Sequence, residues 1–140
     1  MSLIFWDSNL FIYFFEGDDE RAAATKKLRQ SMLERRDQLL TSTLTLGEIL
    51  VKPTALGDQA RCRLYEDVLG KTALILPFDM KAARRYAMVR SKTGVKGPDA
   101  IQLACASGAG VDLFVTNDRR LQGKRVEGIQ FIVALDQVPI

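Results

Sequence analysis

The sequence predicts an α/β fold with a central, mainly parallel sheet of about five strands. Short apolar runs alternate along the chain with longer segments that have helical periodicity. The first apolar run, residues 3–6, is continuous rather than alternating, as in strands buried on both faces of a parallel sheet. The 140 residues are 47% apolar and 26% charged, and no repeat or low-complexity linker divides them. We therefore expect a single globular domain over residues 1–140.

The first half of the chain holds two predicted strands, which alternate with helices. Residues 9–15 follow the first strand as a short helix, and residues 18–36 form a longer one with an apolar stripe beside a charged face. Residues 38–42 are the next apolar run and predict the second strand. A further helix covers residues 46–51, and Pro53 is expected to end it because proline removes a helical hydrogen bond.

The second half continues the alternation of helix and strand. Residues 58–69 predict a helix, residues 72–76 a strand and residues 80–91 a basic helix. Pro98 opens a helix over residues 99–107, since proline suits the first helical turn. The last two predicted strands are residues 113–116 and 129–133. Glycine or proline is expected to close three of these elements: Gly70, Pro77 and Gly94.

The composition restricts the chemistry that the chain can perform. The sequence has no histidine and only two cysteines, which excludes Ser-His-Asp and Cys-His catalysis, zinc fingers and disulfide scaffolds. Acid–base or metal chemistry must then use carboxylates, which bind hard cations such as Mg²⁺ or Mn²⁺. The net charge of +3 permits an anionic partner such as nucleic acid but does not require one.

The apolar N-terminal segment does not predict a signal peptide or a membrane span. It lacks a basic stretch and a small-residue cleavage site, and Asp7 interrupts it early. It is also shorter than the roughly 18 uninterrupted apolar residues that suggest a transmembrane helix. We expect a cytoplasmic protein with reduced thiols.

Four acidic residues fall near the carboxyl ends of the predicted strands. Asp7 follows the first strand, and Glu48 lies early in the helix after the second. Asp99 opens a late helix, and Asp118 follows the strand of residues 113–116. Since ligands of open parallel sheets bind beyond the carboxyl ends of the strands, we expect the four carboxylates to gather at one edge.

Each acid also has a purely structural explanation. Asp7 could cap the following helix, and Asp99 could interact with a helix dipole. Asp118 could stabilise a turn, and Glu48 could be a solvated helix residue. Crowded carboxylates, however, repel one another unless a cation neutralises them. A bound Mg²⁺ or Mn²⁺ would answer this need and would suit hydrolysis of a phosphodiester.

Four short stretches carry a resemblance to a known family: WDSN at residues 6–9, TSTLTLGEIL at 41–50, GPDAIQLACA at 97–106 and FVTNDRRL at 114–121. In order and spacing they resemble the PIN-domain ribonucleases, especially the VapC-type toxins of bacterial toxin–antitoxin pairs. The resemblance implies a three-layer α/β/α fold and a Mg²⁺- or Mn²⁺-dependent endoribonuclease. It also implies a homodimer that a cognate antitoxin inhibits. The metal-binding and catalytic positions of the family match Asp7, Glu48, Asp99 and Asp118.

Polar and basic residues near these acids are further candidates. Ser8, Asn9, Thr116 and Asn117 could orient the carboxylates and bound water. Among the many basic residues, Lys96 and Arg119 lie nearest in sequence to the acids and are the best candidates to bind RNA phosphates. Ordinary turn chemistry and a solvated helix face remain the alternatives for both groups.

Two other classes of function stay open at the level of sequence. One is a non-catalytic α/β interaction domain that binds a metal ion. The other is an aspartyl-phosphate phosphotransfer domain, although the second position after Asp7 is Asn9 rather than a further aspartate. The leucine-bearing helix from residue 18 and the helices between residues 44 and 69 could bury a dimer or antitoxin interface, or simply form core.

Overall fold

One parallel sheet forms the centre of the protein, and the computed structural model describes residues 1–140. The five strands lie in the order β3-β2-β1-β4-β5, and all four pairings are parallel. The predicted sheet of about five strands is thus confirmed and is parallel throughout. The strands are β1 (Leu3–Trp6), β2 (Gln38–Ser42), β3 (Leu74–Leu76), β4 (Val111–Val115) and β5 (Ile129–Val133).

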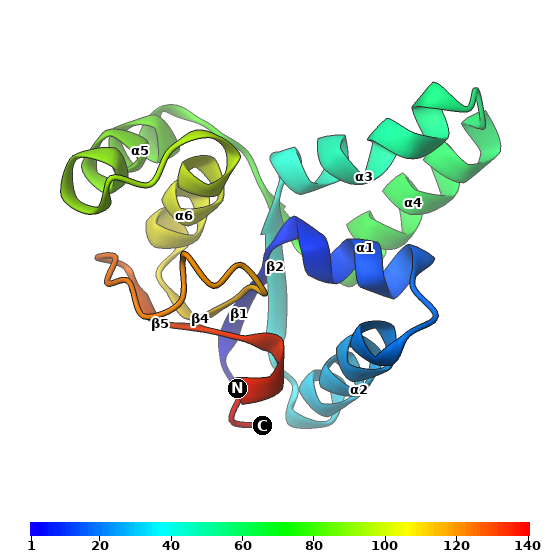
Figure 1. Ribbon diagram of the computed structural model, residues 1–140, viewed down its shortest axis with the longest axis horizontal. Coiled ribbons are helices and arrows are strands. Elements are labelled where there is room, and N and C mark those ends of the chain that lie inside the picture. The colour runs from blue at the N-terminus through cyan, green and yellow to red at the C-terminus, as the bar shows by residue number, and fades with distance from the viewer.

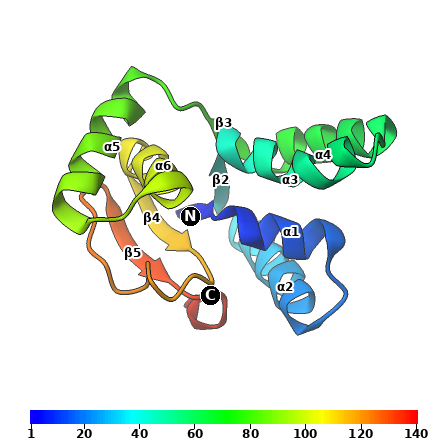
Figure 2. The ribbon, with the colours of Figure 1, turned by 45° about the horizontal axis from the view of Figure 1, so that its top comes forward.

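Helices cover both faces of the sheet and confirm the predicted three-layer α/β/α fold. In Figures 1 and 2, α5 and α6 lie on one side of the strands, and α1 and α2 lie on the other. The helices α3 and α4 pack against each other as a pair that extends away beside α1. The helices are α1 (Ser8–Glu16), α2 (Glu20–Arg35), α3 (Thr43–Ala55), α4 (Gln59–Thr72), α5 (Met80–Thr93) and α6 (Gly97–Ala109), and a 3₁₀ turn, η1, spans Leu135–Gln137.

The continuous apolar pattern of β1 supplies a core to each face. Phe5 points toward α5 and α6 and stacks on Phe114 of β4, with 5.1 Å between ring centroids. Its neighbours Ile4 and Trp6 point to the opposite face, where they join Phe11 of α1. All of these side chains are buried. Since successive strand residues face opposite sides, one short apolar run anchors both helix layers.

Two residues that were expected to end helices do not end them. Pro53 is buried inside α3, which continues to Ala55. The helix can pass the proline because a proline removes only its own N–H and the last turn closes beyond it. There, the Leu56 N–H donates to the carbonyl of Lys52 at 3.1 Å. Gly70 likewise does not end α4, which continues to Thr72.

Several large apolar side chains remain on the surface of the α3–α4 pair. Val51, Leu56 and Leu64 are all exposed, so the leucine-rich region is not wholly core. No helix in the structure combines the length and apolarity that a membrane crossing requires.

The strand order determines where a ligand site can form. From the central strand β1, the chain builds β2 and β3 on one side and β4 and β5 on the other. The connections therefore diverge at β1 and β4, which opens a crevice beyond the carboxyl ends of these strands. Asp7 and Thr116, the residues that follow β1 and β4, lie at this edge.

Candidate active site at the carboxyl edge of the sheet

Asp7 is a buried carboxylate, only 6% exposed, at the junction of β1 and α1. Its Oδ1 accepts a hydrogen bond from the backbone N–H of Ser8 at 2.8 Å, so Asp7 does cap α1. Its Oδ2 accepts a bond from the hydroxyl of Thr116, also at 2.8 Å. The backbone N–H of Asp7 donates to the carbonyl of Val115 at 3.0 Å, which continues the pairing of β1 with β4. Capping therefore accounts for one carboxylate oxygen, and the other is held by the loop after β4.

Thr116 links Asp7 to a second acid. Its buried hydroxyl donates to Asp7 and accepts a hydrogen bond from the backbone N–H of Asp118 at 3.0 Å. One side chain thus fixes both the orientation of the Asp7 carboxylate and the path of the chain at Asp118.

Glu48 reaches the same edge from α3 through a buried polar network. The Ser8 hydroxyl donates to Glu48 Oε1 at 2.6 Å. Gln102 of α6 donates through Nε2 to the hydroxyls of Ser8 and Thr45, at 2.9 and 2.8 Å. The Ser42 hydroxyl donates to Gln102 Oε1, which occupies the amide oxygen as well. Because Gln102 is fully hydrogen-bonded and buried, it holds α1, α3 and α6 in a fixed relation around Glu48.

Asp99 and Asp118 share a cation supplied by the chain. The guanidinium of Arg120 binds both oxygens of Asp118, with Nε to Oδ1 at 3.0 Å and Nη2 to Oδ2 at 2.7 Å. The same Nη2 lies 3.4 Å from Asp99 Oδ2. The two aspartates come from the first turn of α6 and from the loop after β4, so Arg120 ties these segments together.

The electrostatics of the four acids are those of a crowded cluster. Burial raises the pKa of Asp7, opposed by its bonds from Thr116 and Ser8, and the negative charges of Asp99 and Glu48 raise it further. Burial also raises the pKa of Asp99, as does the charge of Asp118. Hydrogen bonds from Arg120 lower the pKa of Asp118. The acids therefore lie close enough to repel, and a positive charge relieves this repulsion at one of them.

The structure brings together all four acids predicted from the sequence, but only half of their predicted polar neighbours. Ser8 and Thr116 bind the carboxylates directly. Asn9 is exposed, and Asn117 Oδ1 instead accepts from the backbone N–H of Leu135 at 3.3 Å. Sequence reasoning missed Gln102, whose only signal was a polar residue within an apolar helix one turn after Asp99.

A model of the PIN domain matches residues 4–126, most of the chain. The chain belongs to the PIN-domain family. The resemblance inferred from the four sequence stretches is thus confirmed at the level of the family.

Solved structures share the fold of this PIN domain at low sequence identity. One is a chain of VapBC2 from Rickettsia felis, solved with a promoter DNA fragment, with a TM-score of 0.69 and 15% identity over 94% of this chain and 98% of that chain. A second is DNA-bound VapBC from Salmonella typhimurium, with a TM-score of 0.68 and 23% identity over 96% of this chain and 99% of that chain. A third is a toxin–antitoxin complex from Klebsiella pneumoniae, with a TM-score of 0.65 and 24% identity over 93% of this chain and 99% of that chain. No curated protein sequence matches the chain.

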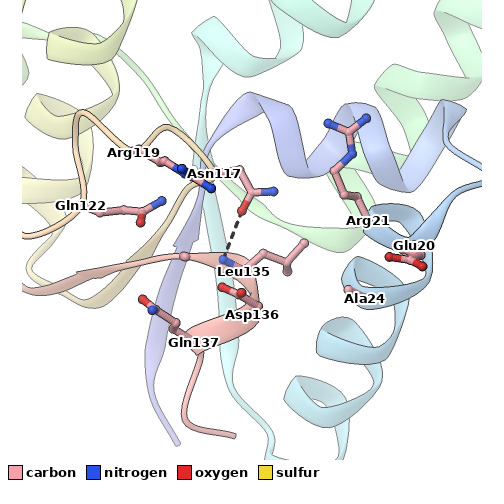
Figure 3. A pocket seen from close by; sticks show the side chains of 10 residues that line it. Glu20, Arg21, Ala24, Asn117, Arg119, Gln122, Leu135, Asp136 and Gln137 are labelled. Carbon is pink, nitrogen blue, oxygen red and sulfur yellow. Dashed lines mark hydrogen bonds between the residues drawn. The ribbon is translucent and has the colours of Figure 1, made fainter.

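The two basic residues predicted to bind phosphate lie in different pockets of this PIN domain. Lys96 lines a pocket of about 310 Å³ together with Asp99, Arg120 and Lys124. Arg119 instead lines a surface pocket of about 710 Å³, beside Asn117. Figure 3 shows this second pocket, in which Arg119 and Asn117 face the η1 turn and Arg21 of α2 lies across from them. None of the four acids lines it.

The donor set of the PIN domain fits a hard divalent cation in its chemistry. All four candidate ligands are carboxylates, and two of them have pKa values raised by burial and by neighbouring negative charge. In the present side-chain arrangement, no three of them surround a common point closely enough to enclose an ion. The cation that pairs with these acids is Arg120, which contacts both Asp99 and Asp118. An ion would have to draw the carboxylates inward and compete with this guanidinium.

Proposed function

We propose that the chain is a Mg²⁺- or Mn²⁺-dependent endoribonuclease and the toxin of a toxin–antitoxin pair. The observation that carries the proposal is the meeting of Asp7, Glu48, Asp99 and Asp118 at one edge of the sheet, from four separate segments of a PIN domain. Burial, and after it the charges of the neighbouring acids, raises the pKa of Asp7 and Asp99. A merely structural set of carboxylates has no need for such a buried cluster.

Asp7 and Asp99 would be the principal ligands of the ion, and Glu48 and Asp118 would complete the site. When bound, a divalent ion activates water for in-line attack on a phosphodiester and stabilises the leaving oxygen. Thr116 and the Ser8 N–H fix the orientation of the Asp7 carboxylate. These bonds hold Asp7 in one rotamer before any ligand arrives, which lowers the cost of ordering the site.

The network around Gln102 performs the same task for Glu48. Through the Ser8 hydroxyl, it holds one carboxylate oxygen of Glu48 and leaves the other without a side-chain partner. That second oxygen would be free to bind the ion.

Substrate phosphates need positive charge near an acidic site. Lys96, Arg120 and Lys124 supply it in the pocket that includes Asp99. Arg119, beside Asn117 in a separate pocket, is a second predicted contact for the RNA chain. Cations in both pockets would give an RNA strand more than one phosphate contact.

The proposal is tested by RNA cleavage with Mn²⁺, with Mg²⁺ and with EDTA. We expect the wild type to cleave a mixed single-stranded RNA only with the divalent ion, and Asp99→Asn to be inactive although its circular dichroism spectrum is unchanged. Asp67→Asn is the matched control because Asp67 is an exposed acid on α4 that pairs only with Lys71, at 3.4 Å. Equal, slow cleavage by wild type and Asp99→Asn would refute the catalytic role and favour a non-catalytic, metal-binding domain.

The toxin role implies a protein partner. VapBC and other toxin–antitoxin complexes share the fold, which supports a cognate antitoxin as the inhibitor and the cytoplasm as the place of action. We expect the wild type to arrest bacterial growth when expressed alone and Asp99→Asn to be harmless. Growth arrest by both proteins would exclude RNA cleavage as its cause. Light scattering should show the proposed homodimer, and a monomeric mass would exclude it.

A further inference from the structure

Arg120 occupies the position of a cation within the acidic cluster. Its guanidinium makes three contacts of 2.7 to 3.4 Å with Asp118 and Asp99, two of the four proposed metal ligands. Its neighbour Arg119 makes no such contact and lies in a different pocket. The position of one arginine, rather than the basic character of the segment, therefore places positive charge among the carboxylates.

Arg120 is held only at its tip. Its side chain is 80% exposed, whereas those of Asp99 and Asp118 are 30% and 17% exposed. An exposed arginine pairs weakly and exchanges partners readily, because water solvates the guanidinium in either position. The pairing neutralises the aspartates without locking the side chain in place.

A basic pocket lies next to the guanidinium of Arg120. Arg120 also lines the pocket of about 310 Å³ that includes Lys96 and Lys124. Two lysines and an arginine around one hollow form a natural site for a phosphate group, and Asp99 at its border keeps it beside the acids. The same side chain thus belongs both to the acidic cluster and to a basic pocket.

We infer that Arg120 is an internal counter-ion, which a divalent cation displaces from Asp99 and Asp118 and which then binds a substrate phosphate in the Lys96–Lys124 pocket. The inference rests on the proposed function, because it requires the four acids to bind an ion. It adds that the guanidinium and the ion compete for the same two carboxylates. Ion binding and RNA binding are then linked: the ion releases the arginine that the RNA uses.

The first test measures Mn²⁺ affinity by isothermal titration calorimetry of the purified protein. Arg120→Gln removes the competitor, and an exposed ion pair of this kind corresponds to about a two- to five-fold tighter Kd for Mn²⁺. Arg120→Lys keeps the charge and should stay closer to the wild type. Arg119→Gln is the matched control, since it removes the same charge from the adjacent residue without breaking a contact to the acids.

The outcomes of the titration separate the inference from the proposed function. Tighter Mn²⁺ binding by Arg120→Gln, with Arg119→Gln near the wild type, supports the competition. Equal tightening in both variants reduces the effect to overall charge and overturns the inference, as does an unchanged or weaker affinity in Arg120→Gln. A wild type that binds no Mn²⁺ refutes the metal site itself, and the inference with it.

The second test measures binding of a short fluorescein-labelled single-stranded RNA by anisotropy, with the Asp99 and Asp118 ligands intact. Ca²⁺ replaces Mn²⁺, and electrophoresis verifies that the recovered RNA is uncleaved. Without the ion, wild type and Arg120→Gln should bind the RNA equally, because the guanidinium is held by the aspartates. With the ion, the wild type should bind several-fold more tightly than Arg120→Gln. A difference between the two proteins that is the same with and without the ion would overturn the exchange.

Discussion

Replacement of Asp7 by asparagine distinguishes the proposed role of this residue as a metal ligand from its role as the cap of α1. Asparagine has the shape of aspartate, so its amide oxygen can still accept from the Ser8 N–H, the bond of 2.8 Å that caps α1. Its amide nitrogen would face the Thr116 hydroxyl, which can act as an acceptor as well as a donor. The substitution therefore removes the charge of Asp7 and preserves its packing.

The stability change follows from opposing contributions. The two hydrogen bonds of residue 7 are no longer made by a charged carboxylate, at a cost of about 1 kcal/mol each. Against this, the burial penalty of the carboxylate and its repulsion by Asp99 and Glu48 disappear. Because these effects outweigh the hydrogen bonds in raising the pKa of Asp7, we expect Asp7→Asn to be at least as stable as the wild type. Asp7→Ala loses the cap and leaves the Thr116 hydroxyl proton without its acceptor, which costs about 2–4 kcal/mol.

Urea denaturation in EDTA at neutral pH measures both variants, and RNA cleavage with Mn²⁺ measures function. We expect Asp7→Asn to be stable and inactive. The pH dependence gives a further check: a raised pKa means that the folded state keeps the Asp7 proton to higher pH than the unfolded chain. The wild type therefore loses stability relative to Asp7→Asn as pH rises from about 4 through the folded-state pKa. If Asp7→Asn is destabilised as much as Asp7→Ala, the charge serves the fold and the ligand assignment fails.

Three other substitutions or additions test separate parts of the structure. Gln102→Leu leaves the buried Ser8 hydroxyl without its amide donor, so it should lower the free energy of unfolding by about 1–3 kcal/mol in a denaturation experiment. In steady-state cleavage, it should lower kcat by a larger factor than it changes KM. Gly128→Ala strains a φ of 91° and drives a methyl group into the Ser107 carbonyl, so it should destabilise by at least roughly 1–3 kcal/mol with unchanged cleavage per folded molecule. At an Mn²⁺ concentration about 100 times its Kd, the wild type should gain about 2.7 kcal/mol of stability and Asp99→Asn far less, as thermal melts would show.

The sheet and the acids could be predicted from the sequence because each depends on a local pattern. The continuous apolar run of β1 and the interrupted apolar stretches of β2 and β5 predicted these three strands with the bounds that the structure has. The acids followed from the position of Asp7 and Asp118 after such runs, since carboxyl ends of parallel strands share an edge. Where the pattern was weaker the bounds moved: β3 begins at Leu74 rather than at residue 72, because α4 extends through Thr72.

The contacts within the site could not be predicted, because they depend on side-chain directions that the sequence does not specify. Arg119 and Arg120 are adjacent and chemically identical, yet only Arg120 reaches the aspartates. Gln102 lies one helical turn after Asp99, a spacing that places both on one face of α6 but does not say that the partner would be Ser8. The closure of α3 beyond Pro53 likewise depends on bonds formed after the proline.

The pairing of β1 with β4 has a consequence for the order in which the molecule is completed on the ribosome. Residues 111–115 are made long after residues 3–6, yet the two segments are neighbours at the centre of the sheet. A nascent chain of the first 98 residues already contains Asp7 and Glu48 but has neither Asp99 nor Asp118, and its central strand lacks one partner. More than four-fifths of the polypeptide is thus synthesised before all four acids are present, because the last of them is residue 118 of 140. The carboxyl edge of the sheet is therefore completed only late in the synthesis of the chain.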